Sequence, residues 1–501
     1  MAADRTELAA FERRLQGERG NEFAQGGEPL AMLYPSPYRA GMSSLGFQWI
    51  LTLLRRAGFA AERAFLPDDP AAWRKSRAPL CTYETRTPLS HFPVIGVSLA
   101  YELELAGLIE ALELAGIPAL RRDRGPHHPI IVLGGPLTFS NPLPAAPFVD
   151  AMLLGEAEET AVPAFAAALG NDRQAFLDAV ERLPGGYVPE RHGDQLPAIA
   201  RADDHLLPAR GGILAPEAEL HDMFLLEGER GCHRACTFCV MRRSTNGGMR
   251  LVEPEHLMDL VPDDARRVGL VGAAISDHPK LVGLLERLVE SGREVGVSSL
   301  RADRIALKPD IARQLRLGGY KTLTVASDAA SQRLRREISK GTTEPHLRAC
   351  AELAREYSYK TLKVYMMVGL PGETDDDSDE LIGFTRELSG RCSVALGVAP
   401  FVPKRNTPMD GASFAGIKVV EQRLDRLSKG LRGRAEVRPT SARWAWVEAE
   451  LARGGPDTGE AVLRAVAAGG RFQHWRAALN AMDPELRRPW AQHEGEATAA
   501  L

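Results

Sequence analysis

The stretch LLEGERGCHRACTFCVMRRSTNGG, residues 225–248, holds three of the six cysteines in this 501-residue chain. Cys232, Cys236 and Cys239 form a C-x3-C-x2-C run that follows directly on the apolar segment MFLLE, which we expect to be a strand. Three thiolates are one ligand short of a closed zinc site, and of the four that normally hold a cubane iron–sulfur cluster. The spacing therefore predicts either a fourth ligand, such as His278, or a cluster with one iron open to a substrate or cofactor. We expect the cluster.

The composition of the whole chain narrows the class of protein. Apolar residues make up 44% and charged residues 26%, as in folded globular proteins, and the length allows two or three domains. The net charge of −4 gives no general reason to bind nucleic acid, and no segment resembles a signal peptide or a membrane span. Six cysteines with three of them clustered are not typical of a disulfide framework. We therefore expect a cytoplasmic protein without membrane or nucleic-acid partners.

Residues 1–195 alternate short apolar segments with amphipathic ones. Strands are expected at residues 30–35, 61–67, 93–99, 129–136 and 149–159. Apolar strands separated by helices predict an α/β fold with a parallel, doubly wound, Rossmann-like sheet. The carboxyl ends of these strands are small or polar, and ligands of such sheets bind there, so the segment predicts a ligand-binding domain.

A second βα series is expected beyond a linker at residues 196–220, which is rich in Pro, Gly and charge. Its strands are expected at residues 223–229, 267–273, 294–300, 321–327, 361–371 and 393–403. Six such units predict a partial (β/α)6 barrel over residues 221–412. Residues 413–501 are expected to form a helical C-terminal region in which Trp475 and Trp490 pack.

The cysteine loop and the strand ends resemble those of a known superfamily. GERGCHRACTFC, residues 228–239, is similar to the cluster loop of the radical S-adenosylmethionine (SAM) superfamily. The later segments LVGAAISDHP, VSSLRADRI, TVASDAASQRLRREISKGTTE, LKVYMMVGLPGETDDD and APFVPKRNTPM resemble strand ends of its cobalamin-linked branch. YPSPYRAGMSSLGFQWI, VIGVSLAYELE, IIVLGGPLTFSNPLP and DAMLLGEAEE resemble the cobalamin-binding domain of the same proteins, the class B radical SAM methyltransferases. The resemblance covers about residues 28–412.

This resemblance implies the chemistry and the cofactors. In the superfamily, the unique iron of a [4Fe–4S] cluster binds the amino and carboxylate groups of SAM. An electron from the reduced cluster cleaves SAM to methionine and a 5'-deoxyadenosyl radical, while the protein binds and orients the cofactors. Cys232, Cys236 and Cys239 are thereby implied to be the catalytic and metal-binding residues. An electron donor such as flavodoxin or ferredoxin is also implied.

The resemblance further implies a set of SAM contacts. Phe238 corresponds to an aromatic residue that shields the cluster, and Gly272 lets SAM approach the backbone. The remaining contacts are Ser298 and Arg301 for the methionine part or the ribose, Ser327 and Asp328 for the ribose, and Met367, Gly369 and Val398 for adenine. Two departures stand out. Many relatives carry Gly-Gly-Glu where this chain has Gly272-Ala273-Ala274, and Asp328 stands where the nearest relatives have Glu.

The cobalamin domain departs from the D-x-H-x-x-G pattern, whose His binds cobalt, because SPYRAGM (residues 36–42) occupies the corresponding loop. The resemblance still favours cobalamin, held without a protein ligand from that loop. Residues implied to border its nucleotide tail and rim are Ser98, Gly134, Gly135, Gly155 and Glu156. The alternative is a degenerate domain that only packs against the barrel.

The expected function is that of a radical SAM enzyme, a cobalamin-dependent methyltransferase that acts on an unactivated carbon of a small molecule or peptide. One alternative is radical cyclisation or rearrangement with the same cofactors. Another is RNA modification of the methylthiotransferase kind, whose enzymes carry three further N-terminal cysteines where this chain has only Cys81. A non-catalytic cobalamin or redox sensor is disfavoured, because it would need no SAM site.

Overall fold

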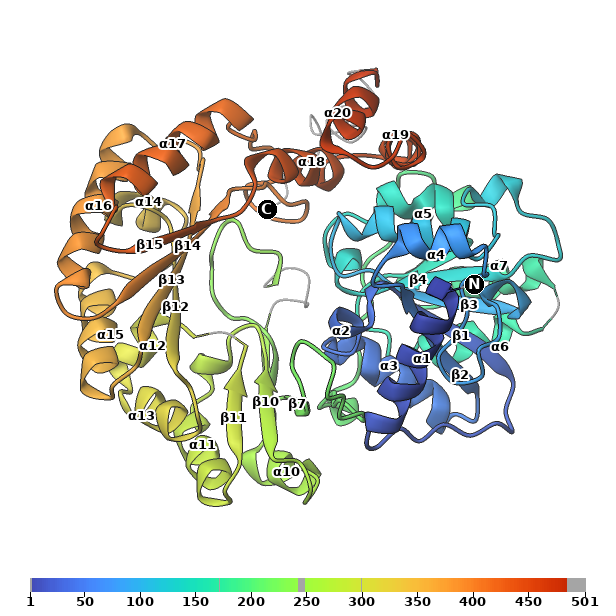
Figure 1. Ribbon diagram of the computed structural model, residues 1–501, viewed down its shortest axis with the longest axis horizontal. Helices are drawn as coiled ribbons and strands as arrows, with labels where there is room; N and C mark the ends of the chain where they lie inside the picture. Colours follow the sequence, from blue (N-terminus) through green and yellow to red (C-terminus); the bar gives the residue numbers. More distant parts are fainter. Residues whose placement is uncertain (1, 171, 242–247, 299, 484–501) are drawn as a thin grey trace. The chain divides into compact units, whose positions relative to one another are not determined.

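The computed structural model describes residues 2–170, 172–241, 248–298 and 300–483 (Figure 1). The chain divides into two compact units, Met1–Asp222 together with Glu450–Leu501, and Met223–Ala449. Trp490 lies outside the described residues. Each unit has its own parallel sheet and its own core.

The first unit is built on a six-stranded sheet with the order β2-β1-β3-β4-β5-β6. The strands are β1 (Pro29–Pro37), β2 (Ala60–Leu66), β3 (Val94–Ser98), β4 (Ile130–Gly134), β5 (Ala151–Leu153) and β6 (Gly186–Tyr187). All neighbours are parallel except β5 and β6. An order of 2-1-3-4-5 is doubly wound, with the strand order reversing between β1 and β3. The Rossmann-like sheet predicted from the sequence is thereby confirmed.

Helices cover both faces of this sheet. They are α1 (Ala2–Gly17), α2 (Tyr38–Gly41), α3 (Leu45–Arg56), α4 (Pro70–Ser76), α5 (Glu104–Leu114), α6 (Ala161–Ala168), α7 (Arg173–Glu181), α8 (Pro189–His192), α19 (Pro456–Ala467) and α20 (Phe472–Asn480). Five 3-10 turns lie at η1 (Leu89–His91), η2 (Arg121–Asp123), η3 (Pro136–Phe139), η4 (Leu143–Phe148) and η5 (Asp204–Leu206). Helix α3 contacts α6, whereas α5 contacts α19. These two pairs lie on opposite faces of the sheet in Figure 1.

The predicted linker, residues 196–220, belongs to the first unit. Ala200 forms a bridge with Gly155, and Leu214 forms one with Arg19, while Ile213 is buried. The composition of the segment suggested a connection, but its apolar side chains, such as Ala200, Ile213 and Leu214, are buried in the first unit. The linker prediction was therefore wrong.

The predicted C-terminal region, residues 413–501, is shared between the two units. Helix α17 (Ile417–Gly430) and strand β15 (Glu436–Pro439) belong to the second unit, and α18 (Ala442–Ala452) leads back to the first. There α19 packs against η4 so closely that a Cβ on Gly459 would lie 2.0 Å from the Pro144 carbonyl oxygen. Trp475 on α20 is buried, as expected. The region is thus not a separate helical domain.

The second unit follows the predicted βα rhythm. One parallel sheet has the order β11-β10-β7 and another the order β12-β13-β14-β15, and an isolated parallel bridge between Arg301 and Ala326 connects them. The strands are β7 (Met223–Glu227), β10 (Arg267–Val271), β11 (Glu294–Val297), β12 (Thr322–Asp328), β13 (Thr361–Val368) and β14 (Val394–Pro400), followed by β15. A short hairpin, β8 (Glu229–Gly231) with β9 (Met249–Leu251), flanks the cysteine loop. This succession of parallel strands is that of a partial β/α barrel.

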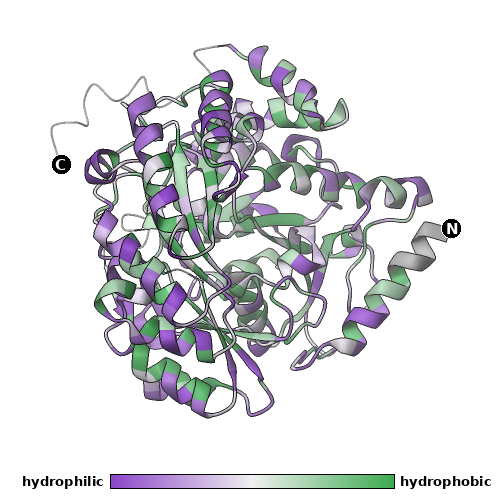
Figure 2. Cartoon of the chain, turned by 60° about the vertical axis from the view of Figure 1, so that its left-hand side comes forward, coloured by the Kyte–Doolittle hydropathy of each residue, from purple (hydrophilic) through white to green (hydrophobic). Residues whose placement is uncertain are grey.

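One face of these strands is covered by helices and the other is more open. The helices are α10 (Pro254–Leu260), α11 (Leu281–Glu290), α12 (Ala302–Leu307), α13 (Asp310–Leu317), α14 (Gln332–Glu337), α15 (Glu344–Glu356) and α16 (Asp375–Ser389), with α17, and a further 3-10 turn is η6 (Ile275–Asp277). Buried and half-exposed residues alternate along β12 and β13. Figure 2 shows the same division in the helices, whose apolar and polar residues lie on different sides. The open face is the one available to ligands.

Candidate active site

The three cysteines lie together in the loop that follows β8. Their side chains are half-buried, the Cys239 N–H donates to the Cys236 carbonyl at 3.3 Å, and the Arg234 N–H lies 3.4 Å from the Cys232 Sγ. Burial raises the pKa of Cys232 and of Cys239, and so does the negative charge of a neighbouring cysteine in its thiolate form. A multivalent cation would reverse this effect, since metal-bound thiols are deprotonated.

Three free cysteine thiols are the kind of ligand that holds an iron–sulfur cluster. Within the described ranges, no three or more His, Cys, Asp or Glu side chains are already arranged to hold a metal ion. The assignment of Cys232, Cys236 and Cys239 as ligands stays a prediction.

Asp277, at the end of η6, anchors the cysteine loop. Arg234 donates to its two carboxylate oxygens at 2.7 and 2.6 Å, and Arg304 donates at 2.5 Å. Burial by itself would raise the pKa of Asp277, but the two guanidinium groups lower it to about 2. This ion-paired cluster holds the backbone of the loop beside the end of β10.

His278 does not fit the role of a fourth ligand. Its Nε2 lies 3.0 Å from the Val252 carbonyl oxygen, and its Nδ1 accepts the Lys280 N–H at 3.2 Å. Both ring nitrogens are thus used inside the protein, and the side chain is buried. The structure therefore supports the alternative in which His278 does not complete the site.

The end of β10 brings Gly272 and Ser298 together with a residue that the sequence interpretation missed. The Ser298 hydroxyl accepts the Gly272 N–H at 3.0 Å and donates to its carbonyl at 2.9 Å. A Cβ on Gly272 would lie 2.3 Å from Oε1 of Glu229, so only glycine allows this carboxyl to lie there.

Glu229, beside Gly272, is a buried acid with one unpartnered carboxyl oxygen among the described residues. It is 1% exposed, its Oε1 accepts the Ala274 N–H at 2.6 Å, and its Oε2 has no hydrogen-bond partner among the described residues. Burial raises its pKa to about 7. Two features of the sequence could have pointed to Glu229. It lies three residues before Cys232, and the chain has Ala273-Ala274 after Gly272, where many relatives have Gly-Glu.

Asp328 and Ser327 end strand β12 on different faces. Asp328 has a left-handed backbone, with φ of 60°, and forms an ion pair with Lys340. Ser327 is 2% exposed, donates to the Ala329 carbonyl at 3.0 Å and accepts from Arg335 at 3.2 Å. The ribose contact of Asp328 stays a prediction, whereas the Ser327 hydroxyl is bonded inside the protein on the face covered by helices, which contradicts its predicted ribose contact.

Arg301 is also committed to the protein. Its guanidinium donates to Asp303 at 3.0 Å and to the Lys340 carbonyl at 2.8 Å, and the residue is 7% exposed. The Arg301 side chain is thus bonded inside the protein, and its predicted contact with SAM stays a prediction. Arg301 positions the segment that carries Lys340, which the sequence interpretation also missed.

The predicted adenine contacts lie at the ends of β13 and β14. Met367 is half-buried on the open face, and Gly369, with φ of 86°, donates its N–H to Glu373. Val398 is buried, and its carbonyl accepts the Thr440 N–H at 2.9 Å, where the chain continues from β15. That carbonyl therefore already accepts one hydrogen bond inside the protein, and the adenine contact of Val398 stays a prediction. Phe238 is half-buried between two of the cysteines.

In the first unit, Gly134 leaves room at the carboxyl end of β4, whereas Ser98 at the end of β3 is buried. A Cβ on Gly134 would come no closer than 3.9 Å to another residue. By contrast, a Cβ on Gly135 would lie 2.6 Å from the Leu99 carbonyl oxygen, so this glycine is required by the protein's own backbone. The space at Gly134 fits a ligand beyond the sheet, and the assignment of Ser98, Gly134 and Gly135 as residues that border cobalamin stays a prediction.

Gly155 and Glu156 do not form an open rim. A Cβ on Gly155 would lie 2.5 Å from the Ala200 carbonyl oxygen, and the Glu156 carboxylate accepts the Ala202 N–H at 2.9 Å. Both residues pack against the segment that was predicted to be a linker. The sequence could not show this, because the contact joins residues more than forty positions apart.

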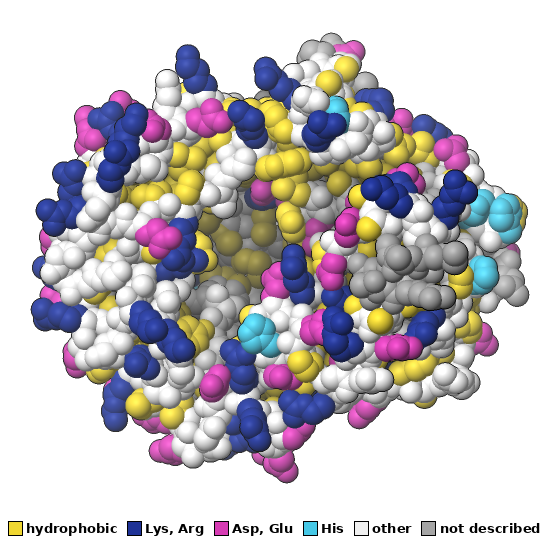
Figure 3. All heavy atoms as spheres, viewed as in Figure 1, with side chains coloured by type: hydrophobic (Ala, Val, Ile, Leu, Met, Phe, Trp, Pro, Cys, Tyr) yellow, Lys and Arg dark blue, Asp and Glu magenta, His cyan; other side chains and the backbone are white. Residues whose placement is uncertain are grey.

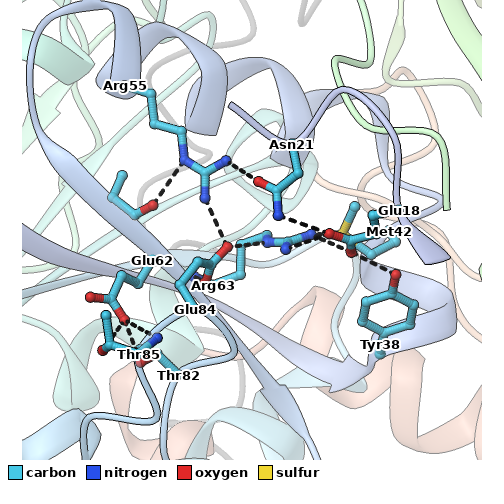
Figure 4. A network of polar contacts seen from close by, with 11 residues as sticks. Glu18, Asn21, Tyr38, Met42, Arg55, Glu62, Arg63, Thr82, Glu84 and Thr85 are labelled. Atoms are coloured by element: carbon cyan, nitrogen blue, oxygen red, sulfur yellow. Dashed lines mark hydrogen bonds and ion pairs between the residues drawn. The ribbon is translucent and has the colours of Figure 1, made fainter. Parts of the chain in front are cut away.

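The loop after β1 is fixed by a buried network of charged groups (Figure 4). Tyr38 donates to Glu18 at 2.7 Å, and Arg63 donates to Glu18 and to Glu84, both at 2.7 Å. Arg55 adds a bond to Glu84 at 2.8 Å. The segment around Tyr38 is therefore fixed by ion pairs and hydrogen bonds inside the first unit.

The surface gives no sign of one dominant charge. In the face shown in Figure 3, basic and acidic side chains are interspersed over both units. No helix in the described part of the chain is long and apolar enough to cross a membrane.

Comparisons with known proteins agree with the fold and the cysteine loop. The profile of the N-terminal part of radical SAM proteins matches residues 46–189, and that of the radical SAM superfamily matches residues 228–385. The loop after β8 and the βα series after it thus define an enzyme that works with SAM. The chain belongs to the radical SAM superfamily.

Individual relatives share less than 30% sequence identity with this chain in the two comparisons that follow. An uncharacterized protein of Methanocaldococcus jannaschii is 28% identical over 80% of this chain and 84% of its own length. The ribosomal protein uS12 methylthiotransferase RimO of an Anaeromyxobacter species is 29% identical over 41% of this chain, which spans 46% of that enzyme.

Among solved structures, the cobalamin-dependent SAM radical enzyme OxsB, with aqua-cobalamin and SAM bound, shares the fold. Its TM-score is 0.51 and its identity 14%, over 81% of this chain and 56% of the OxsB chain.

Proposed function

We propose that this enzyme cleaves SAM reductively with a [4Fe–4S] cluster and uses cobalamin to transfer a methyl group to an unactivated carbon of a small molecule or peptide. The observation that carries the proposal is the three-cysteine loop, which is anchored by Asp277 at the carboxyl end of a parallel βα series. A doubly wound sheet with a glycine, Gly134, at the carboxyl end of β4 supports the cobalamin part.

The residues have separate tasks in this proposal. When bound, the cluster would supply the electron for cleavage of SAM, and cobalamin would supply the methyl group. Cys232, Cys236 and Cys239 would hold the cluster, and Asp328 on the open face of β12 would accept hydrogen bonds from the ribose. Gly134 would leave space for cobalamin, and Ser98 would border it. The proposal includes a cytoplasmic location, where thiols stay reduced, and a donor such as flavodoxin or ferredoxin.

A second candidate is sulfur transfer of the methylthiotransferase kind. It is supported by the match to RimO over 41% of the chain. Against it, the part of the chain before residue 232 contains one cysteine, Cys81, which is buried. Cyclisation or rearrangement with the same cofactors remains a third candidate, and product analysis separates the three.

Anaerobic reconstitution tests the proposal. The protein should bind close to four iron and four sulfide per chain, take up hydroxocobalamin, and release 5'-deoxyadenosine after reduction in the presence of SAM. Cys236→Ala should lose most of the iron, whereas Cys392→Ala, outside the loop, should keep it. Zinc without sulfide in protein purified without oxygen would contradict the cluster, and SAM cleavage without cobalamin uptake would contradict methyl transfer through cobalt.

A further inference from the structure

Strand β13 carries a lysine and a tyrosine on the open face of its sheet. It lies between β12 and β14, and helices α15 and α16 cover the other face of these strands (Figure 1). Along β13 the residues Lys363, Tyr365 and Met367 alternate with buried ones, so their side chains share the open face. Tyr365 is 46% exposed although it lies in the middle of a central strand. The cofactor contacts proposed above use neither Lys363 nor Tyr365.

The two side chains are bonded to each other and held in place by small residues. The Lys363 ammonium donates to the Tyr365 hydroxyl at 2.7 Å and lies 4.4 Å from the centre of the ring. The ring lies against Gly397 of β14, where a Cβ would come within 2.7 Å of the Tyr365 Cδ1. On the other side, the partner of Tyr365 in the sheet is Ala326 of β12. The two neighbouring strands therefore leave the space that the ring needs.

Positive charge is in excess around this pair. Glu436 and Arg438 of β15 continue the rows of Lys363 and Tyr365 across the sheet. Arg438 donates to Glu436 at 2.6 Å, and this bond, together with the charge of Lys363, lowers the pKa of Glu436. One carboxylate is thus shared between two cations. Among the described residues, Lys363 has its hydrogen bond to Tyr365 but no ion pair.

Both side chains keep donors for a ligand. A lysine ammonium has three N–H donors, and a tyrosine hydroxyl has one O–H. The bond between them uses one ammonium N–H, and because the Tyr365 oxygen is the acceptor, its own O–H can still donate. Donors that converge beside an unpaired ammonium favour an anionic oxygen, since hydrogen bonds to charged acceptors are the stronger ones.

We propose that Lys363 and Tyr365 bind an anionic group of the substrate, a carboxylate or a phosphate. This inference rests on the radical SAM function proposed above and adds the chemical class of its substrate. Tyr365 lies two residues before Met367, or roughly 7 Å along the strand from the proposed SAM contacts. The site therefore selects a small molecule or peptide whose acidic group lies within a few bonds of the carbon that reacts.

Binding of two simple anions to cluster-loaded protein saturated with S-adenosylhomocysteine tests the assignment. Pyrophosphate represents a phosphate group and succinate a carboxylate, and isothermal titration calorimetry measures both. At least one of them should bind, and the tighter one identifies the group. Lys363→Gln should weaken this binding by roughly 10- to 100-fold and Tyr365→Phe by roughly 2- to 10-fold. Lys280→Gln, which removes an exposed lysine outside these strands, is the matched control and should bind like the wild-type protein.

The outcomes separate this inference from the proposed function. The assignment is overturned if the wild-type protein binds neither anion, or if Lys363→Gln binds as tightly as the wild-type protein. It is also overturned if S-adenosylhomocysteine abolishes the binding, because the anion then occupies the SAM site. Release of 5'-deoxyadenosine from reduced wild-type protein judges the SAM function by itself. Anion binding without this release contradicts the proposed function and leaves the anion site standing, whereas release without anion binding overturns the inference alone.

Discussion

Replacing Glu229 by Gln should stabilise the second unit at neutral and alkaline pH, in protein prepared without iron. The carboxyl is 1% exposed, with one oxygen on the Ala274 N–H and the other without a partner among the described residues. Burial raises its pKa from 4.5 to about 7. The folded protein therefore holds a proton that the unfolded chain releases at lower pH.

The sign and size of the effect follow from this difference. Because the pKa is higher in the folded state, stability is lost as pH rises from about 4.5 to about 7, and the loss is complete above that range. A difference of about 2.5 in pKa corresponds to about 3 kcal/mol. The amide of Gln carries no charge and can still accept the Ala274 N–H. The variant should match the wild-type protein near pH 4 and exceed it by up to about 3 kcal/mol at pH 8.

Urea denaturation between pH 4 and 8 measures this difference. Hydrogen exchange of peptides from β10 reports the second unit separately, which is needed because a chain of two units does not unfold in one step. Glu253→Gln removes an exposed carboxylate paired with Lys280 and should show no comparable gain. A Glu229→Gln variant that is no more stable relative to the wild-type protein at pH 8 than at pH 5 would refute the reasoning.

Three further perturbations test other parts of the structure. Asp277→Asn should lower the iron retained after reconstitution and destabilise the second unit by roughly 3–5 kcal/mol, because Arg234 and Arg304 lose a buried partner; iron assay and urea denaturation measure both effects. Gly134→Val should block hydroxocobalamin uptake, followed in the visible spectrum, at unchanged iron content. Arg63→Met should destabilise the first unit by roughly 3–5 kcal/mol in thermal unfolding, because two buried carboxylates lose their partner, while Arg39→Met, on the surface, should change little.

Local patterns predicted the strands well. The apolar segments from Leu30 to Leu153 and from Met223 to Pro400 became the expected parallel strands, because burial on one or both faces is visible as periodicity along the chain. Strand β15 was missed, since EVRP has almost no apolar pattern and forms a strand only because it extends the edge of β14.

The residues of the candidate site were harder to predict from the sequence than the strands, because tertiary contacts decide which side chains lie there. The spacing of the cysteines and the strand-end position of Asp328 are local features, and both could be recognised in the sequence. Glu229 lies against Gly272, and Lys340 forms an ion pair with Asp328; in both pairs the partner is not a neighbour in the sequence. Ser327 is one residue from Asp328, yet it faces the helices, and the irregular pairing between Ala326 and Asp328 decides which side chain reaches the open face.

The return of the C-terminal helices to the first unit has a consequence for synthesis on the ribosome. Helix α19 contributes Ala461, Val462 and Ala465 to the core beside η4 and α5. The first unit therefore cannot bury that surface when residue 222 emerges, but must wait for all of Met223–Ala449 to be made. At about 5–20 residues per second, this wait lasts roughly 10–50 s. During translation the second unit can complete its fold first, while the apolar surface beside η4 and α5 stays exposed until the last helices are made.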